Sequence, residues 1–219
     1  NITVKSGQKV AIVGPTGAGK TTLINLLMRF YDVDGGSILV DGVDTKEMTR
    51  HELRDRFGMV LQDAWLFEGS IRDNIAYAQD NLPEEKIIAA ARSASVDSFI
   101  KTLPGGYDFE LSTGAENISQ GQRQLLTIAR AMASDPEIMI LDEATSNVDT
   151  HTEQLIQKAL AKLMHGRTSF VIAHRLSTIR DADMILYMEH GDILEHGSHE
   201  ELMAQHGKYE ALYMSQFAQ

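Results

Sequence analysis

The chain has 219 residues, which is long enough for one α/β domain with a sizeable core and an inserted subdomain. The 20 Lys and Arg residues against 31 Asp and Glu residues give a net charge of −11, and no basic stripe stands out, so the composition disfavours a nucleic-acid partner. The absence of cysteine excludes disulfides and thiolate metal sites, and no apolar stretch approaches the roughly 18 residues that a membrane-spanning helix needs.

The first half of the sequence begins with strands and then turns helical. The chain opens without Met in a predicted strand, so we expect a domain cut from a longer protein. The predicted elements are strands Ile2–Val4 and Lys9–Val13, helix Thr21–Phe30, strand Ser37–Val40 with an Asp41-Gly42 hairpin turn, helix Thr49–Phe57, strand Gly58–Leu61, helices Ile71–Tyr77 and Pro83–Ser95, and a loop over Leu103–Asn117.

The second half alternates helices and strands. A helix opens at Ser119, with Gln122 three residues later in a capping-box arrangement, and runs to Ser134. It is followed by strand Glu137–Leu141, helix Thr150–Met164, strands Thr168–Ile172 and Met184–Tyr187, a hairpin turning at Gly191, and helices Ser198–Gln205 and Tyr209–Gln216. The alternation predicts an α/β fold with a mainly parallel central sheet, a small antiparallel β portion and an inserted α-helical subdomain over residues 71–134.

A phosphate-binding loop lies between the Lys9–Val13 strand and the helix that follows it. Residues 14 to 22 read Gly-Pro-Thr-Gly-Ala-Gly-Lys-Thr-Thr, which is a P-loop in the context that its mechanism needs. The glycines let backbone N–H groups point at a polyphosphate, Lys20 adds a positive charge, and the Thr21 hydroxyl is placed to ligate Mg²⁺. The alternative is a glycine-rich turn before a helix. The predicted ATP-binding residues are Gly14, Pro15, Thr16, Gly17, Ala18, Gly19, Lys20, Thr21 and Thr22.

An acidic pair follows another apolar strand. Residues 138–141 end in Asp142 and Glu143, at the strand edge where open α/β sheets place ligands. Asp142 would hold Mg²⁺ through water, and Glu143 would act as the base that polarises the attacking water. An acidic pair after a strand can also be a solvated turn. Together with the P-loop, it predicts an ATPase whose P-loop NTPase core covers residues 1–70 and 135–219.

Further segments resemble the nucleotide-binding domain of an ATP-binding cassette (ABC) transporter of the exporter type. Residues 118–122, Ile-Ser-Gln-Gly-Gln, resemble the ABC signature, whose usual form is Leu-Ser-Gly-Gly-Gln. Gln62 matches the Q-loop, 146–149 the D-loop and His174 the switch histidine. The motifs occur in the family's order and cover nearly the whole chain, so the resemblance implies ATP hydrolysis coupled to export.

The resemblance also implies a dimer. In the family, two domains pack head-to-tail, and each ATP lies between one P-loop and the partner's signature, so Ser119, Gly121 and Gln122 would face the partner's nucleotide. From the residues alone, Ser119 begins a helix, where N–H groups and the helix dipole favour an anion, but it also suits a plain N-cap. Asp149 would sense the partner, and it too suits an N-cap.

Three more residue roles follow from the resemblance. His174 would contact the γ-phosphate and orient Glu143 and the attacking water, whereas a lone His after a strand would usually be a surface or packed residue. Gln62 would complete the Mg²⁺ shell and report ATP to a transmembrane partner, whereas a lone Gln there would usually be solvated. The Trp65–Phe67 cluster is either core packing or the docking surface for that partner.

One departure from the family concerns the signature. Gln120 replaces the first glycine, which resembles one half of a heterodimeric multidrug-type exporter, so a heterodimer is favoured over a homodimer. The family's adenine-stacking aromatic residue lies upstream of Asn1. We expect a location at the cytoplasmic face of the cell membrane, as part of an integral membrane transporter. The alternatives are a soluble ABC ATPase acting on ribosomes or DNA, and a regulatory nucleotide-binding module.

Overall fold

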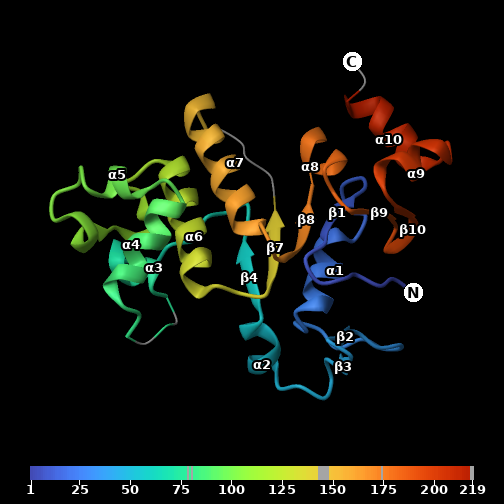
Figure 1. Cartoon of the computed structure of the whole chain (residues 1–219), viewed down its shortest axis with the longest axis horizontal. Coiled ribbons are helices and arrows are strands. Elements are labelled where there is room, and N and C mark those ends of the chain that lie inside the picture. Colours follow the sequence, from blue (N-terminus) through green and yellow to red (C-terminus); the bar gives the residue numbers. More distant parts are fainter. Residues whose placement is uncertain (78, 80, 143–147, 174, 218–219) are drawn as a thin grey trace. The chain divides into compact units, whose positions relative to one another are not determined.

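The chain forms two compact units. The computed structural model describes residues 1–77, 79, 81–142, 148–173 and 175–217. The first unit comprises Asn1–Phe57, Glu137–Ala144 and Gly166–Gln219, and the second comprises Gly58–Pro136 and Thr145–His165. Figure 1 shows both units as helices and strands coloured along the chain. The predicted boundaries of the helical subdomain, 71–134, stay a prediction.

A mostly parallel sheet forms the core of the first unit. Its strands lie in the order β10-β9-β1-β8-β7, with only β10 antiparallel to its neighbour. Val10, Ala11 and Ile12 of the central strand are fully buried, as expected for a parallel strand covered on both faces. The strands are β1 (Lys9–Val13), β7 (Ile138–Asp142), β8 (Thr168–Ile172), β9 (Met184–Glu189) and β10 (Asp192–Gly197).

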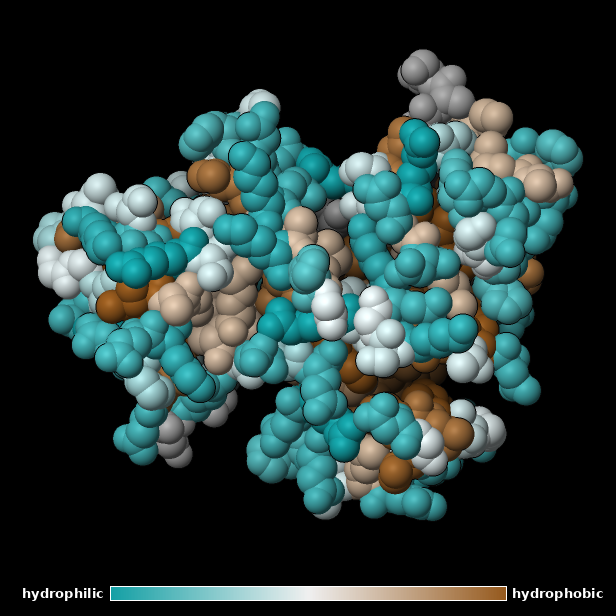
Figure 2. Space-filling view, viewed as in Figure 1, coloured by the Kyte–Doolittle hydropathy of each residue, from teal (hydrophilic) through white to brown (hydrophobic). Residues whose placement is uncertain are grey.

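Helices and a small hairpin complete the first unit. The helices are α1 (Lys20–Leu27), α2 (Arg50–Asp55), α8 (Leu176–Arg180), α9 (His199–Ala204) and α10 (Lys208–Phe217). Strands β2 (Leu39–Val40) and β3 (Val43–Asp44) pair antiparallel across Asp41 and Gly42, which confirms the predicted hairpin. Hydrophobic residues, coloured brown, gather over this hairpin in Figure 2. Leu39 and Val43 of the hairpin are exposed.

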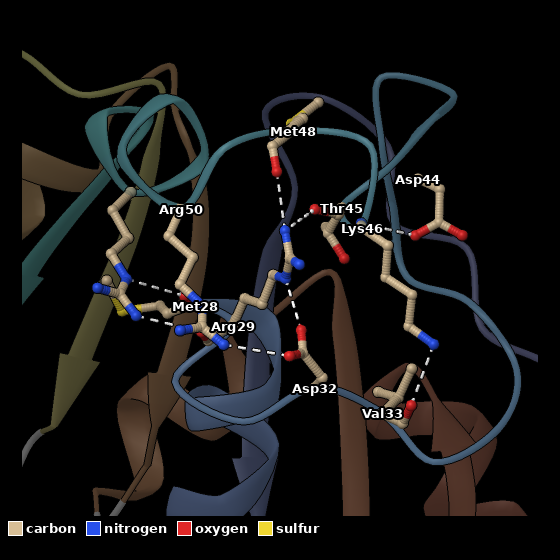
Figure 3. A network of polar contacts seen from close by, with 10 residues as sticks. Met28, Arg29, Asp32, Val33, Asp44, Thr45, Lys46, Met48 and Arg50 are labelled. Carbon is tan, nitrogen blue, oxygen red and sulfur yellow. Dashed lines mark hydrogen bonds and ion pairs between the residues drawn. The ribbon is translucent and has the colours of Figure 1, made fainter.

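An arginine joins the end of α1 to the hairpin and to the segment before α2 (Figure 3). The guanidinium of Arg29 donates to the carbonyls of Thr45, at 2.9 Å, and Met48, at 2.8 Å, and its Nε donates to Asp32 at 2.6 Å. Arg54 from α2 donates back to the carbonyl of Arg29 at 3.1 Å. These contacts fix the far end of the helix whose first turn belongs to the P-loop.

The second unit is mainly helical. Its helices are α3 (Ile71–Ile75), α4 (Glu84–Ser93), α5 (Asp97–Ile100), α6 (Gln120–Ser134) and α7 (Thr150–Met164), and α6 packs against α3, α4 and α7. Strands β5 (Gly69–Ser70) and β6 (Glu110–Leu111) form a two-stranded sheet, and β4 (Phe57–Val60) leads into the unit. Among the described helices, none is both long and apolar enough to cross a bilayer.

Most predicted elements are confirmed, and three differences stand out. The strand predicted at Ile2–Val4 is wrong, because this segment enters no strand ladder in the described structure. The loop predicted over Leu103–Asn117 contains β6, whose two residues are too few to show a period in the sequence. Helix α8 was not predicted, because its five residues cover little more than one turn.

The Arg29 contacts make a testable contribution to stability. Arg29→Met should lower the free energy of unfolding by about 2 kcal/mol, because two carbonyls lose a charged donor and the Thr45 residue is buried. Hydrogen exchange should accelerate first in residues 39–48. The matched control is Arg50→Met, which removes only an exposed ion pair with Asp32 and should cost less than about 1 kcal/mol. Equal effects of the two changes would contradict this account.

Candidate nucleotide-binding site

The P-loop lies directly against the turn between β9 and β10. Gly14 has a φ of +147°, and a Cβ atom there would lie 2.1 Å from the carbonyl oxygen of Met188. The N–H of Gly191 donates to the carbonyl of Ala18 at 2.9 Å, which closes the contact from the other side. Glycine is therefore required at the first motif position by packing, in addition to any contact with phosphate.

The Lys20 ammonium folds back over the loop. Its Nζ donates to the carbonyls of Gly14, at 2.7 Å, and Pro15, at 3.0 Å. Burial lowers the pKa of Lys20, and the negative charge of Asp142 partly opposes this shift. The predicted Mg²⁺ ligand on β7 and the predicted phosphate-binding lysine are thus electrostatic neighbours. A phosphate at the loop would offer the ammonium stronger acceptors than two carbonyls.

The N-terminus of α1 suits an anion. The helix begins at Lys20 after Gly19, and no side chain caps it. Thr21 and Thr22 are exposed in its first turn. Uncapped N–H groups and the positive end of the helix dipole both favour a bound phosphate. The Thr21 hydroxyl and the Asp142 carboxylate are hard oxygen donors, which suits Mg²⁺ bound mainly by phosphate and water.

The described residues offer no ready-made cage for a metal ion. Among them, no three His, Cys, Asp or Glu side chains come together in a way that could hold one. Mg²⁺ seldom needs such a cage, because it keeps several waters and binds through one or two protein ligands plus the substrate phosphates. The donor set in the first unit therefore fits this ion.

The signature segment forms a capping box at the start of α6, as predicted. The Ser119 hydroxyl accepts a hydrogen bond from the N–H of Gln122 at 3.3 Å, and the Gln122 side-chain oxygen accepts from the N–H of Ser119 at 2.9 Å. The cap uses the hydroxyl as an acceptor, so its proton can still be donated outward, and Ser119 is exposed. The N-cap role and an anion-binding role are compatible.

Gly121 is buried against the first turn of α7. A Cβ atom at Gly121 would lie 2.3 Å from Cγ2 of Thr152 and 3.1 Å from Cγ1 of Val148. Asp149 caps α7 by accepting from the N–H of Thr152 at 3.0 Å, and this bond lowers the pKa of Asp149. Gly121 therefore allows close packing between α6 and α7, and its contact with nucleotide stays a prediction.

The loop after β4 is divided between surface and core. Gln62 is exposed, Trp65 is 60% exposed, and Leu66 is buried at 2%. The two readings of the Trp65–Phe67 cluster thus apply to different residues, because Leu66 belongs to the core and Trp65 to the surface. Of the other predicted site residues, Glu143 and His174 lie outside the described residues, as do Ser146 and Asn147 of the D-loop.

Comparison with known proteins identifies the family. The family model described as "ABC transporter" matches residues 1–146. The chain belongs to the ABC transporter family. It is 56% identical over 209 residues to a fatty acid ABC transporter ATP-binding/permease protein of Mycobacterium bovis, a match that covers 95% of this chain and 33% of that one. It is 50% identical to an ATP-dependent lipid A-core flippase of Desulfotalea psychrophila, over 99% of this chain and 38% of that one.

A solved structure agrees with this assignment. A bacterial Atm1-family ABC exporter with ATP bound matches with a TM-score of 0.89 and 44% identity, over 99% of this chain and 38% of that chain. The chain spans about a third of the length of the curated relatives that it matches. The ABC assignment confirms the predicted α/β fold, nucleotide binding and the ATPase class. It favours an exporter over a soluble ABC ATPase.

Sequence reasoning missed two features of this ABC domain. One is the turn at Met188–Gly191 that supports the P-loop, since nothing in the motif points to a strand some 170 residues away. The other is Arg130 on α6, which contacts the loop after Gln62. Its charge in the middle of an otherwise apolar helix stretch was the available signal.

The contact at Gly121 gives a sharp test of α6–α7 packing. Gly121→Ala should lower the free energy of unfolding by about 1–3 kcal/mol, because the new methyl group overlaps Cγ2 of Thr152. Thr152→Ser removes that methyl group and keeps the backbone N–H that Asp149 caps. Chemical denaturation of the double variant should therefore recover part of the loss relative to Gly121→Ala. Strict additivity of the two single changes would contradict the contact.

Proposed function

We propose that this chain binds ATP with Mg²⁺, dimerises head-to-tail and hydrolyses ATP to power substrate export by a membrane transporter. The observation that carries the proposal is that the N-termini of α1 and α6 differ in how they are capped. The α1 terminus has no side-chain cap and begins with the basic residue Lys20, whereas the α6 terminus is capped by Ser119, whose hydroxyl still has a proton to donate. Family membership supports their use on one triphosphate shared by two copies.

The residues divide the chemistry as follows. Lys20 and the uncapped N–H groups of α1 neutralise and orient the phosphates, while Thr21, Asp142 and Gln62 would hold Mg²⁺. When bound, this ion neutralises charge on the β- and γ-phosphates. Glu143 takes the proton of the attacking water, and His174 holds that water in line. Hydrolysis then needs little covalent chemistry from the protein beyond positioning.

The partner copy completes the site. Ser119, Gly121 and Gln122 of one copy would approach the γ-phosphate bound by the other, and Asp149 would lie at the same interface. Association of the two copies would thus depend on bound ATP, and hydrolysis would allow the copies to separate. The loop from Gln62 to Phe67 would contact the transmembrane partner at the cytoplasmic face of the cell membrane. This is in keeping with relatives that combine ATP-binding and permease parts in one chain.

The catalytic assignment can be tested on turnover and assembly together. Glu143→Gln should lower ATP turnover by about a hundredfold or more, since the general base is lost, while ATP binding persists and a stable ATP-bound dimer accumulates. Phosphate release measures the ATP turnover, and light scattering measures the mass of the assembly. Lys20→Ala is the matched control and should lose ATP binding itself. Unchanged hydrolysis by Glu143→Gln would remove this residue from the role of base.

The identity of the second copy is a separate prediction. We propose a heterodimeric partner, because the Gln120 side chain stands where the family has a glycine nearest the partner's γ-phosphate. The chain alone should then hydrolyse ATP slowly, and Gln120→Gly should raise the rate several-fold at equal ATP affinity. Gln120→Ala should give an intermediate rate, since it shortens the side chain without freeing the backbone. A fast rate in the parent chain, unaltered by either change, would favour a homodimer.

A further inference from the structure

Arg130 joins three segments of the second unit. It lies on α6, and its Nη1 donates to the carbonyl of Trp65 at 3.0 Å. Its Nε donates to the carbonyl of Asn74 at 2.8 Å, and its Nη2 donates to the Asn74 side-chain oxygen at 2.9 Å. One planar side chain thus ties the signature helix to α3 and to the loop after Gln62.

Asn74 completes the connection from the other side. Its side chain is fully buried and donates to the carbonyls of Phe67 and Ser70, both at 3.0 Å. Its oxygen also accepts from the N–H of Phe67 at 3.1 Å. The partners of the Asn74 side chain are backbone groups and Arg130. These hydrogen bonds therefore fix the backbone path of the loop as well as the conformation of the Asn74 side chain. Arg130 and Asn74 together form a single polar junction.

Aromatic rings cover this junction. The Arg130 guanidinium lies 4.9 Å from the ring centroid of Tyr77 and 5.9 Å from that of Trp65. The two rings meet edge to face at 6.2 Å, and they remain 47% and 60% exposed. Arg130 is half-buried, and this burial lowers the pKa of its guanidinium. A half-buried cation thus contacts two exposed rings.

This arrangement is hard to replace. A lysine would keep the charge, but its single nitrogen cannot bridge the Asn74 and Trp65 carbonyls and stack on two rings in one geometry. Arg130 lies eleven residues after Ser119 on the same continuous helix, or about 16 Å along the axis. A displacement of α6 at Ser119 would therefore be transmitted along the helix to Arg130, and from Arg130 to the rings of Trp65 and Tyr77.

We propose that Arg130 is a positioning residue that makes the exposed rings of Trp65 and Tyr77 move as one body with the signature helix. The inference rests on the proposed function, in which nucleotide engages Ser119 and the loop after Gln62 contacts a transmembrane partner. It adds the connection between those two events. If Arg130 only stabilised the core, its replacement would change stability but not how the rings respond to ATP.

The test uses Trp65, which is the only tryptophan in the chain. Labelling with 5-fluorotryptophan gives a single ¹⁹F resonance that reports on the ring. In a Glu143→Gln background, MgATP should shift this resonance as the ATP-bound dimer forms. Arg130→Lys should retain ATP binding and dimer formation but reduce the shift to a small fraction. Arg92→Met, which removes an exposed arginine of the same unit, should leave the shift unchanged.

Parallel measurements of ATP affinity and dimer mass separate the possible outcomes. A full shift in Arg130→Lys, or no shift in the parent despite an ATP-bound dimer, would overturn the inference and leave the proposed function intact. Failure of the parent to bind ATP or to dimerise would overturn the proposed function, and this inference with it. Should Arg130→Lys fold poorly by circular dichroism, Tyr77→Leu keeps every Arg130 hydrogen bond and should reduce the shift only in part.

Discussion

The close approach of Gly14 to the Met188 carbonyl is the constraint on which the nucleotide site depends. Only a residue without Cβ can lie there, and the contact presses the P-loop against the β9–β10 turn. This contact restricts the freedom of the loop, and the Lys20 ammonium donates to the loop's own carbonyls. A preformed loop costs less ordering on binding, which favours tight association with a polyphosphate.

In the proposed dimer, the N-termini of α1 and α6 would divide the work between copies of the chain. The α1 terminus leaves its first N–H groups uncapped, so it can bind phosphate alone. The α6 terminus pairs the N–H groups of Ser119 and Gln122 through its capping box, and the Ser119 hydroxyl keeps a proton for a ligand. A partly capped terminus offers an anion fewer free N–H donors than an uncapped one. In the proposed dimer, a nucleotide bound at the α1 terminus of one copy would gain a further contact from the α6 terminus of the other.

The sequence predicted those features that are local. Apolar runs revealed β1, β7 and β8, and the spacing of Ser119 and Gln122 revealed the cap, because each depends on neighbours in the chain. The contacts of Gly121 with Thr152, and of Arg130 with the Trp65 loop, join segments far apart in sequence, so no local pattern could show them. The predicted role of Glu143 rests on its place after an apolar strand in a chain with a P-loop, whereas that of His174 rests on family resemblance.

The central claim is that one copy's P-loop meets the other copy's signature across ATP. Because the chain has no cysteine, two can be introduced without background: Thr16→Cys in one copy and Gln120→Cys in the other, both with Glu143→Gln. With an added oxidant such as copper phenanthroline, a disulfide between the mixed copies should form in the presence of MgATP and should not form when the nucleotide is removed before oxidation. Cross-linking at the same rate without nucleotide, or none in a dimer saturated with MgATP, would contradict the account.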